Sequence, residues 1–357
     1  MPNKALIAMS GGVDSSVAAY LVKDKGYDCI GATMKLFQNE DIGLSKEHTC
    51  CSIDDVEDAR RVATSLDMPF YVLNFSENFK EKVVDKFVSC YENGLTPNPC
   101  IECNRHLKFE HLYNKAKELG YEYVVTGHYS RIDYNESTGR YELKKATDPT
   151  KDQSYVLYTM TQEQLSHTLF PLGHMTKDQV RELAELKSFI NAKKHDSQDI
   201  CFVPNGKYAE FIESYTKKRY PEGDFVDLEG NVLGRHKGII RYTIGQRRGL
   251  GLSLKKSMYV VKVDPISNTV VLGYNDDLFT TTLCAKDVNL ISIPEITGEL
   301  RCKARPRYNA KEAWATVTRL DENRIQVVFD EPQRAITKGQ AVVLYDEDTV
   351  IGGGTIC

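Results

Sequence analysis

The most constraining feature of this chain is a short stretch rich in glycine and serine near its start, Ser-Gly-Gly-Val-Asp-Ser-Ser at residues 10–16. It follows an apolar run at residues 5–9, which predicts a buried parallel strand, and it precedes residues 17–22, which predict a helix. A strand, a glycine turn and a helix in this order aim backbone N–H groups and the positive end of the helix at an anion. The stretch therefore predicts a phosphate site, because an ordinary turn would not explain its serines and its aspartate.

Each residue type in this stretch suits a nucleotide phosphate. Gly11 and Gly12 permit positive φ and let the backbone approach an anion closely, and the three serines can donate hydroxyl groups. Asp14 would repel phosphate directly, so we expect it to hold Mg²⁺ that bridges phosphates. The Gly-Lys-Ser/Thr ending of a Walker A loop is absent from the sequence.

Length and composition limit the class of protein. A chain of 357 residues is long enough for two or three domains, and its hydrophobic content of 41% with 27% charged residues is typical of a globular protein. No apolar run reaches the roughly 18 residues of a membrane span. The predicted first strand leaves no room for a signal peptide, so we expect a cytoplasmic protein with no membrane association. Ten cysteines in such a chain indicate reactive or metal-binding thiols rather than disulfides.

Charge is unevenly distributed along the chain. The net charge is −4, but residues 186–260 hold 14 Lys and Arg against 8 Asp and Glu. This asymmetry is compatible with one side of the molecule that faces an anionic partner, and equally with a basic face that only contacts solvent.

The first half of the chain alternates predicted strands and helices. The strands are expected at residues 29–34, 70–74 and 121–126, and the helices at 54–66 and 79–91. This alternation predicts a doubly wound parallel sheet whose ligands bind at the carboxyl ends of the strands. The stretch at residues 10–16 and Gly127-His128 would both lie at that edge. Further along, a hairpin is predicted at 131–145 and helices at 176–186 and 208–218.

From about residue 223 the sequence becomes rich in short β segments. Runs at 238–242, 258–263 and 269–273 are separated by glycines, which is typical of a small barrel, and a second set includes 313–317, 325–329 and 340–344. We therefore expect three domains: an α/β catalytic domain at 1–205, a central β-barrel at 206–280 and a C-terminal β-barrel at 281–357.

A second unusual stretch, Thr-Pro-Asn-Pro-Cys-Ile-Glu-Cys-Asn-Arg at residues 96–105, contains a C-x-x-C pair. Its two prolines predict a rigid loop that presents Cys100 and Cys103. A zinc site would need a second pair at zinc spacing, which the chain lacks. A sulfur-transfer dithiol and an iron–sulfur cluster both remain open, with Cys201 as the natural third cysteine. We expect Arg105 and Lys108 to lower the pKa of a neighbouring thiol.

Seven short motifs, taken in their order along the chain, match the pattern of a known enzyme family. They lie at residues 10–16, 98–104, 127–129, 151–155, 200–202, 242–250 and 304–308. The chain resembles the bacterial tRNA-specific 2-thiouridylases, whose first motif is the PP-loop of the N-type ATP pyrophosphatases. The match covers nearly the whole chain, although any one of the later motifs alone would be weak.

The resemblance implies a sulfurtransferase reaction. In that family ATP adenylates O2 of the wobble uridine of tRNA with release of pyrophosphate, and sulfur then replaces the activated oxygen. The implied ATP-binding residues are Ser10, Gly11, Gly12, Val13, Asp14, Ser15, Ser16, Met34 and Gly127, with Mg²⁺ near Asp14. The implied catalytic residues are Cys103, which carries a persulfide, and Cys201, which forms a disulfide with Cys103 as sulfur is released. Asn98, Pro99 and Cys100 would contact the target base, and His128, Lys151, Asp152, Gln153, Arg307, Tyr308 and Gln340 would face the tRNA.

One residue departs from the family pattern. Many members have Asp where this chain has Cys100, and Cys100, Cys103 and Cys201 together could hold a [4Fe–4S] cluster that delivers sulfide by way of an open iron. The resemblance further implies tRNAs for Lys, Glu and Gln as substrates and a cysteine desulfurase or a sulfur-relay protein as sulfur donor. We expect a monomer that binds one tRNA.

Two other classes of function remain to be tested. One is a PP-loop ligase that acts on a small molecule, similar to argininosuccinate synthetase, although such an enzyme does not need a pair of thiols. The other is a non-catalytic RNA-binding module with a relic nucleotide fold, which the intact stretch at residues 10–16 argues against.

Overall fold

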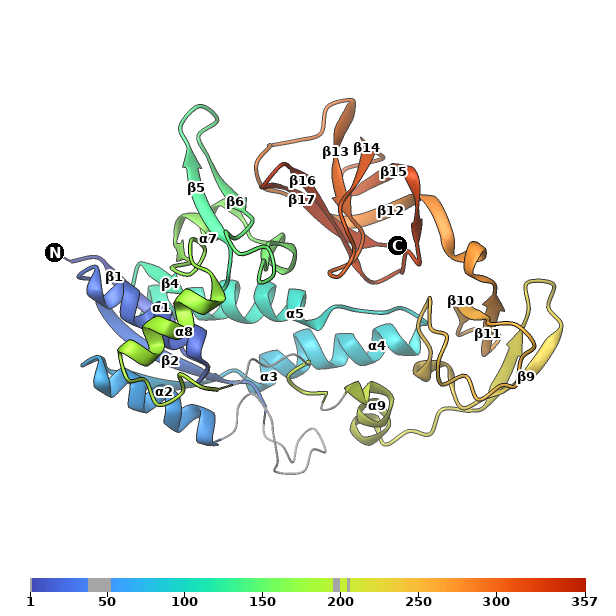
Figure 1. Cartoon of the computed structure of the whole chain (residues 1–357), viewed down its shortest axis with the longest axis horizontal. Coiled ribbons are helices and arrows are strands. Elements are labelled where there is room, and N and C mark those ends of the chain that lie inside the picture. Colours follow the sequence, from blue (N-terminus) through green and yellow to red (C-terminus); the bar gives the residue numbers. More distant parts are fainter. Residues whose placement is uncertain (1, 38–52, 195–199, 204–205) are drawn as a thin grey trace.

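The computed structural model describes residues 2–37, 53–194, 200–203 and 206–357 (Figure 1). The polar segment at residues 38–52, which includes Cys50 and Cys51, lies outside the described residues. Within the described ranges, no helix combines the length and the hydrophobicity needed to cross a bilayer.

A parallel sheet forms the first part of the fold, as predicted. In the described part of the chain its strand order is β3-β2-β1-β4-β7, and every neighbouring pair is parallel. The strands are β1 (Lys4–Ala8), β2 (Asp28–Lys35), β3 (Phe70–Asn74), β4 (Tyr123–Val125) and β7 (Thr168–Leu169). The order reverses between β1 and β4, and ligands of doubly wound sheets bind at the carboxyl ends of strands at such a switch point.

Helices cover both faces of this sheet. The side chains of Ala5 and Ile7 on β1 pack with helices α1 (Val13–Asp24), α2 (Ile53–Ser65) and α8 (Lys177–Leu186). Leu6, which points to the opposite face, packs with α6 (Leu112–Glu118). The alternation of side chains along one strand therefore supplies both hydrophobic layers.

Two long helical stretches extend from the sheet toward the rest of the molecule (Figure 1). The first comprises α3 (Ser76–Phe79), the π-helix η1 (Lys80–Asp85) and α4 (Lys86–Glu92). The second comprises α5 (Pro99–Glu102), the π-helix η2 (Cys103–His111) and α6. The prediction of a rigid loop at residues 96–105 is therefore wrong from Pro99 onward. The Asn98 side chain accepts a hydrogen bond from the N–H of Cys100, and Pro99 occupies the first helical position, so these residues begin a helix.

The middle of the chain contains helix α9 (Tyr208–Thr216) and a four-stranded sheet of order β10-β11-β8-β9 within the described residues. Its strands are β8 (Gly223–Val226), β9 (Val232–His236), β10 (Tyr259–Asp264) and β11 (Thr269–Gly273). The prediction of a strand at 238–242 is wrong, because Ile239–Arg241 forms a short 3-10 helix, η5. Gly238 precedes it at φ 98°, a left-handed conformation that interrupts an extended strand.

The last part of the chain forms a closed barrel. In the described residues the strands β12-β15-β14-β13-β16-β17 pair in this order, and β12 also pairs with β17. Their bounds are β12 (Phe279–Leu290), β13 (Glu299–Arg305), β14 (Ala313–Arg319), β15 (Arg324–Arg334), β16 (Ala341–Asp346) and β17 (Thr349–Ile356). The predicted hairpin, β5 (Arg131–Asn135) and β6 (Arg140–Lys144), joins this sheet through a pairing of Thr349 with Lys144. The fold class is thus confirmed, with a parallel α/β domain that precedes barrel domains.

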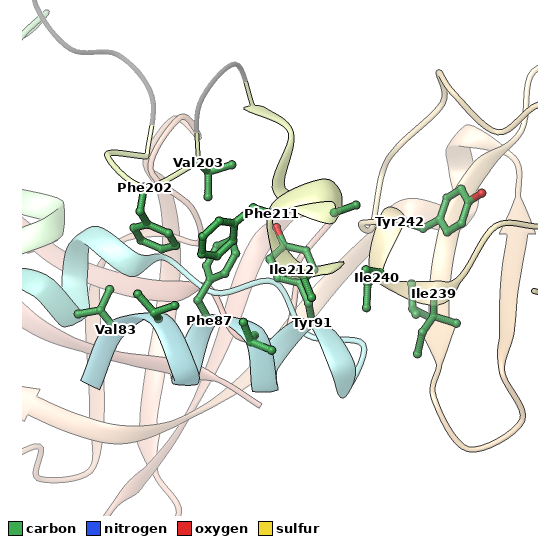
Figure 2. Packing of buried hydrophobic residues seen from close by; sticks show 14 of the residues in the cluster. Val83, Phe87, Tyr91, Phe202, Val203, Phe211, Ile212, Ile239, Ile240 and Tyr242 are labelled. Carbon is green, nitrogen blue, oxygen red and sulfur yellow. The ribbon is translucent and has the colours of Figure 1, made fainter. Parts of the chain in front are cut away.

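One hydrophobic cluster joins α4, α9 and the middle domain (Figure 2). The Phe87 ring on α4 lies 5.2 Å from the ring of Phe202 and 6.2 Å from that of Phe211, and all three side chains are almost fully buried. Cys103 and Cys201 both pack against this cluster. The cluster therefore holds together two cysteine-bearing segments that are about a hundred residues apart in the sequence.

The substitution Phe87→Ala should lower the free energy of unfolding by about 3–5 kcal/mol, because it removes a fully buried ring and leaves a cavity. Phe279→Ala is the matched control, since Phe279 is 43% exposed and its loss should cost about 1 kcal/mol or less. Urea titrations followed by circular dichroism measure both, and equal costs would contradict the central place of Phe87 in the cluster.

Candidate active site

The stretch at residues 10–16 connects β1 to α1 at the switch point of the sheet. Gly11 has a φ of 74°, and Gly12 precedes the helix without a side-chain cap, which leaves the first N–H groups of α1 without an acceptor at that position. The hydroxyl groups of Ser15 and Ser16 donate to the carbonyl oxygen of Gly12 at 3.0 and 3.1 Å. These serines stabilise the turn in this arrangement, and the Ser10 N–H donates to the Ser15 hydroxyl at 3.2 Å. Ser10 itself is exposed.

Two glycines permit close backbone packing around this loop. A Cβ atom on Gly127 would lie 2.8 Å from the backbone carbonyl carbon of Asp14 and from the N of Ser15. A Cβ atom on Gly11 would lie 2.3 Å from the carbonyl oxygen of Asp55, in the first turn of α2. The loop is therefore held between the end of β4 and the start of α2, where no larger residue fits.

Asp14 accepts three hydrogen bonds from other elements. The Lys177 ammonium group lies 2.8 Å from Oδ1 and 2.9 Å from Oδ2, and the Tyr129 hydroxyl donates to Oδ1 at 2.8 Å. Lys177 and Tyr129 are both buried. Oδ2 accepts only one of these bonds and the Asp14 side chain is 30% exposed, so its expected place near Mg²⁺ stays a prediction.

Sequence reasoning missed the residues that support the loop from α8 and beyond. The buried amide of Asn191 donates to the carbonyl oxygen of Gly11 at 2.9 Å and to the Ser16 hydroxyl at 2.8 Å. Lys194 forms ion pairs with Asp55 at 2.6 Å and Asp58 at 2.8 Å. No local pattern marks these residues, since their role depends on contacts between segments far apart in the chain.

The C-x-x-C pair begins the second helical stretch. Cys100 is exposed and Cys103 is half-buried, and all the cysteines that the structure describes are free thiols. Burial raises the pKa of the Cys103 thiol to about 11, although the Lys108 ammonium group lowers it in part. The expected lowering of this pKa by neighbouring cations is therefore wrong for this conformation, because desolvation outweighs the charge of Lys108.

The three cysteines do not form a metal site here. In the described residues, no three His, Cys, Asp or Glu side chains group closely enough to hold a metal ion. The alternative in which Cys100, Cys103 and Cys201 hold an iron–sulfur cluster therefore finds no support.

The loop before the cysteines is fastened to the C-terminal barrel. The Gln340 amide donates to the carbonyl oxygens of Thr96 and Pro97 at 2.9 and 3.2 Å, and the Thr96 N–H donates to the carbonyl oxygen of Lys338 at 3.0 Å. Gln340 thus contacts the segment that leads into Asn98, and its expected contact with tRNA stays a prediction.

The segment at residues 151–153 contacts the barrel as well. Tyr308 is 36% exposed, and its hydroxyl donates to the carbonyl oxygen of Asp152 at 3.3 Å. The Asp152 side chain is buried and accepts from the N–H groups of Ala146 and Ser154 at 3.1 and 3.2 Å. Arg307 is exposed beside Tyr308. The structure therefore brings together several of the residues predicted to face the tRNA.

His128 lies in the interior at 7% exposure. Its Nε2 lies 3.3 Å from the Lys108 ammonium group and its Nδ1 lies 2.6 Å from the Thr126 hydroxyl. Because lysine only donates, Nε2 accepts and Nδ1 carries the proton. Burial and the charge of Lys108 hold the pKa of His128 well below its ordinary value. The predicted contact of His128 with tRNA stays a prediction. Met34 is half-buried, and its predicted contact with adenosine also stays a prediction.

Comparison with known proteins adds to this geometry. Residues 3–205 match the model of the tRNA methyl transferase HUP domain, residues 209–274 that of the tRNA methyl transferase PRC-barrel domain, and residues 280–356 that of the aminomethyltransferase beta-barrel domain. A tRNA-specific 2-thiouridylase MnmA of Clostridioides difficile is 57% identical over 356 residues, which cover 100% of this chain and 98% of the relative. The chain belongs to the tRNA-specific 2-thiouridylase family.

Further relatives of this family match over almost the same length. The enzyme of the same name from Clostridium perfringens is 51% identical, with 99% of this chain and 98% of the relative covered. The one named MnmA 1 from Thermoanaerobacter sp. X514 is 52% identical with the same coverage. The predicted family is thus confirmed, which argues against a small-molecule ligase and against a non-catalytic RNA-binding module.

The substitution Gly127→Ala should weaken ATP binding by at least about tenfold, because the added methyl group would displace the backbone of Asp14 and Ser15. Isothermal titration of ATP measures this loss. Gly120→Ala is the control, because a Cβ atom there meets nothing within 4 Å and only the positive φ of Gly120 is penalised. Unchanged ATP affinity in the Gly127→Ala variant would contradict the tight packing of the loop.

Alkylation of Cys103 by iodoacetamide in the absence of tRNA should be slow at pH 7.5 and should accelerate as the pH rises toward about 11, because only the thiolate reacts. Mass spectrometry of peptides follows the reaction, with the exposed Cys100 in the same sample as an internal comparison of access. Fast labelling of Cys103 at neutral pH would show that its thiol is not desolvated as described.

Proposed function

We propose that this chain catalyses the ATP-dependent 2-thiolation of the wobble uridine in tRNA. The observation that carries this proposal is identity of 50–57% over the full length to relatives named tRNA-specific 2-thiouridylase, together with an ATP-type loop at the switch point of the sheet. We propose ATP as the nucleotide that binds to the loop at residues 10–16 of the domain at residues 3–205. The proposed substrates are tRNAs for Lys, Glu and Gln, and the proposed site of action is the cytoplasm.

The first step activates an unreactive carbonyl. Oxygen O2 of the uridine attacks the α-phosphorus of ATP, a P–O bond to the β-phosphate breaks, and pyrophosphate leaves. Residues 10–16 bind the phosphates through backbone N–H groups and the positive end of α1. The uridine then carries AMP on O2, which is a far better leaving group than the original oxygen. Mg²⁺ bound with ATP would neutralise phosphate charge, and Asp14 would lie near it while it also pairs with Lys177.

The second step replaces oxygen with sulfur. The terminal sulfur of a Cys103 persulfide attacks C2, and AMP departs with the original O2. The Cys201 thiolate then attacks Sγ of Cys103, which leaves sulfur on the base and forms a disulfide between the two cysteines. A thiol reductant restores both thiols, and a cysteine desulfurase or a sulfur-relay protein supplies the next persulfide. The packing of Cys103 and Cys201 against one hydrophobic cluster supports this pairing.

The raised pKa of Cys103 is compatible with this sequence of steps. Without tRNA, the thiol is half-buried and neutral at pH 7, which protects it from unspecific reactions. Exposure of Cys103 when the base enters would lower its pKa toward the ordinary value, because desolvation is the main cause of the shift.

The other components of the proposal follow from the placement of residues. Asn98, Pro99 and Cys100 begin the helix that carries Cys103 and would contact the target base. Lys151, Asp152, Gln153, Arg307, Tyr308, Gln340 and His128 would contact the tRNA directly or hold residues that do. The enzyme is proposed to act as a monomer with domains at 1–205, 206–280 and 281–357.

The substitution Cys103→Ser should abolish formation of 2-thiouridine while one equivalent of pyrophosphate is still released per enzyme, because adenylation does not need the thiol. The reaction contains ATP, Mg²⁺, unmodified tRNA, a cysteine desulfurase and cysteine, and nucleosides are identified by mass spectrometry. Cys284→Ser is the matched control, because Cys284 lies on the barrel strand β12 and has no part in the mechanism. Full thiolation by the Cys103→Ser variant would refute its role, and no thiolation by the unaltered protein would refute the function.

A further inference from the structure

Tyr129 is the last residue of the motif Gly-His-Tyr at residues 127–129 and has no role in the mechanism above. It nevertheless connects the loop at residues 10–16 with the segment at residues 151–153. Its side chain is 2% exposed, and its hydroxyl donates to Oδ1 of Asp14 at 2.8 Å. Its backbone pairs twice with Gln153: the Tyr129 N–H donates to Oε1 at 3.0 Å, and the Gln153 N–H donates to the Tyr129 carbonyl at 2.9 Å. One residue therefore contacts the ATP loop and the segment at residues 151–153.

A second connection joins the same two places through Asp148. Its Oδ1 accepts from the N–H and the hydroxyl of Thr150 at 2.9 and 2.6 Å, and its Oδ2 accepts from the N–H of Lys177 at 3.1 Å. The Lys177 ammonium group in turn pairs with Asp14. Hydrogen bonds from Thr150 and from the Lys177 N–H lower the pKa of Asp148, so it is ionised when it holds these groups. Both connections thus converge on the Asp14 carboxylate.

The charges at Asp14 explain what these connections do. A bare carboxylate beside the phosphates of ATP would repel them, and Lys177 and the Tyr129 hydroxyl offset its charge. A contact that fixes residues 151–153 fixes Gln153, which bonds to Tyr129, and Lys151, whose N–H donates to the Asp148 carbonyl oxygen at 3.2 Å. Through these bonds it also fixes Tyr129 and Asp148. Occupancy of this segment therefore favours the arrangement in which Asp14 is neutralised and ATP binds well.

We propose that Tyr129 and Asp148 are positioning residues that couple contact of tRNA at residues 151–153 to binding of ATP at residues 10–16. This inference rests on the proposed function, since it needs both ligands. Coupling of this kind is reciprocal, so tRNA should tighten nucleotide binding by the same factor by which nucleotide tightens tRNA binding. Its consequence is that ATP is held most firmly when a tRNA is present to be adenylated.

The test is a thermodynamic cycle with the full-length protein. The probe is an ATP analogue with a methylene group between the α- and β-phosphorus atoms, in the presence of Mg²⁺, and the second ligand is a tRNA transcript with an unmodified wobble uridine. Isothermal titration gives the affinity for the analogue with and without tRNA, and the ratio of the two values measures the coupling. We expect a ratio of at least about five in the unaltered protein.

The variant Tyr129→Phe removes only the hydroxyl that contacts Asp14. It should reduce the ratio to below about two while the affinity for tRNA without nucleotide stays the same, and Asp148→Asn should reduce the ratio as well. Tyr71→Phe is the control, because Tyr71 is 52% exposed on the strand β3. If Tyr129 had only a structural role, Tyr129→Phe would change the affinity for the ATP analogue equally with and without tRNA, and the ratio of the two values would stay the same. Thermal unfolding verifies that each variant folds.

The outcomes separate this inference from the proposed function. An unaltered ratio in Tyr129→Phe overturns the role proposed for Tyr129. A ratio of one in the unaltered protein overturns the coupling itself if that protein thiolates tRNA. If the unaltered protein binds both ligands but forms no 2-thiouridine, the proposed function fails and the measured ratio still decides whether the connections couple the two sites.

Discussion

The structure depends on one close backbone contact, that of Gly127 at the end of β4 with Asp14 and Ser15 after β1. A side chain at Gly127 would overlap the loop, so the glycine fixes how near the two strand ends approach at the switch point of the sheet. This contact orients the start of α1 and the residues that follow Gly127 in the chain. His128 then turns inward to Lys108, and Tyr129 reaches Asp14, so the motif after β4 and the loop after β1 form one unit.

The segments that carry Cys103 and Cys201 are positioned by different forces. Helix α5 begins at Pro99 with Asn98 as its cap, and the barrel holds the preceding loop through Gln340. The hydrophobic cluster around Phe87 then brings the segments of Cys103 and Cys201 against the same core. The C-terminal barrel therefore contributes the contacts that place the start of α5 relative to the sheet. The burial that achieves this also keeps Cys103 neutral.

Those parts of the fold and the site that depend on the conformational preferences of neighbouring residues could be predicted from the sequence. The strand, glycine turn and helix around residues 10–16 were predictable because glycine, serine and buried apolar residues each have a local conformational preference. The two prolines predict a loop where α5 begins, although proline in the first helical position after an asparagine cap is also a signal for a helix start. Lys177 and Asn191 could not be predicted, since only the packing of α8 and its neighbours brings them to the loop. The pKa of Cys103 is higher than the sequence predicts, because neighbouring charges can be read from a sequence and burial cannot.

The most direct test of the account follows the oxygen atom that sulfur replaces. An anticodon stem-loop with ¹⁸O at O2 of the wobble uridine is converted in a single turnover with ATP and a sulfur donor, and AMP, pyrophosphate and water are analysed by mass spectrometry. If the loop at residues 10–16 serves to adenylate O2 before sulfur attacks C2, the label is recovered in AMP, which becomes heavier by one ¹⁸O. Label in water, with unlabelled AMP, would contradict adenylation of the base and with it the link between the ATP loop and the thiols.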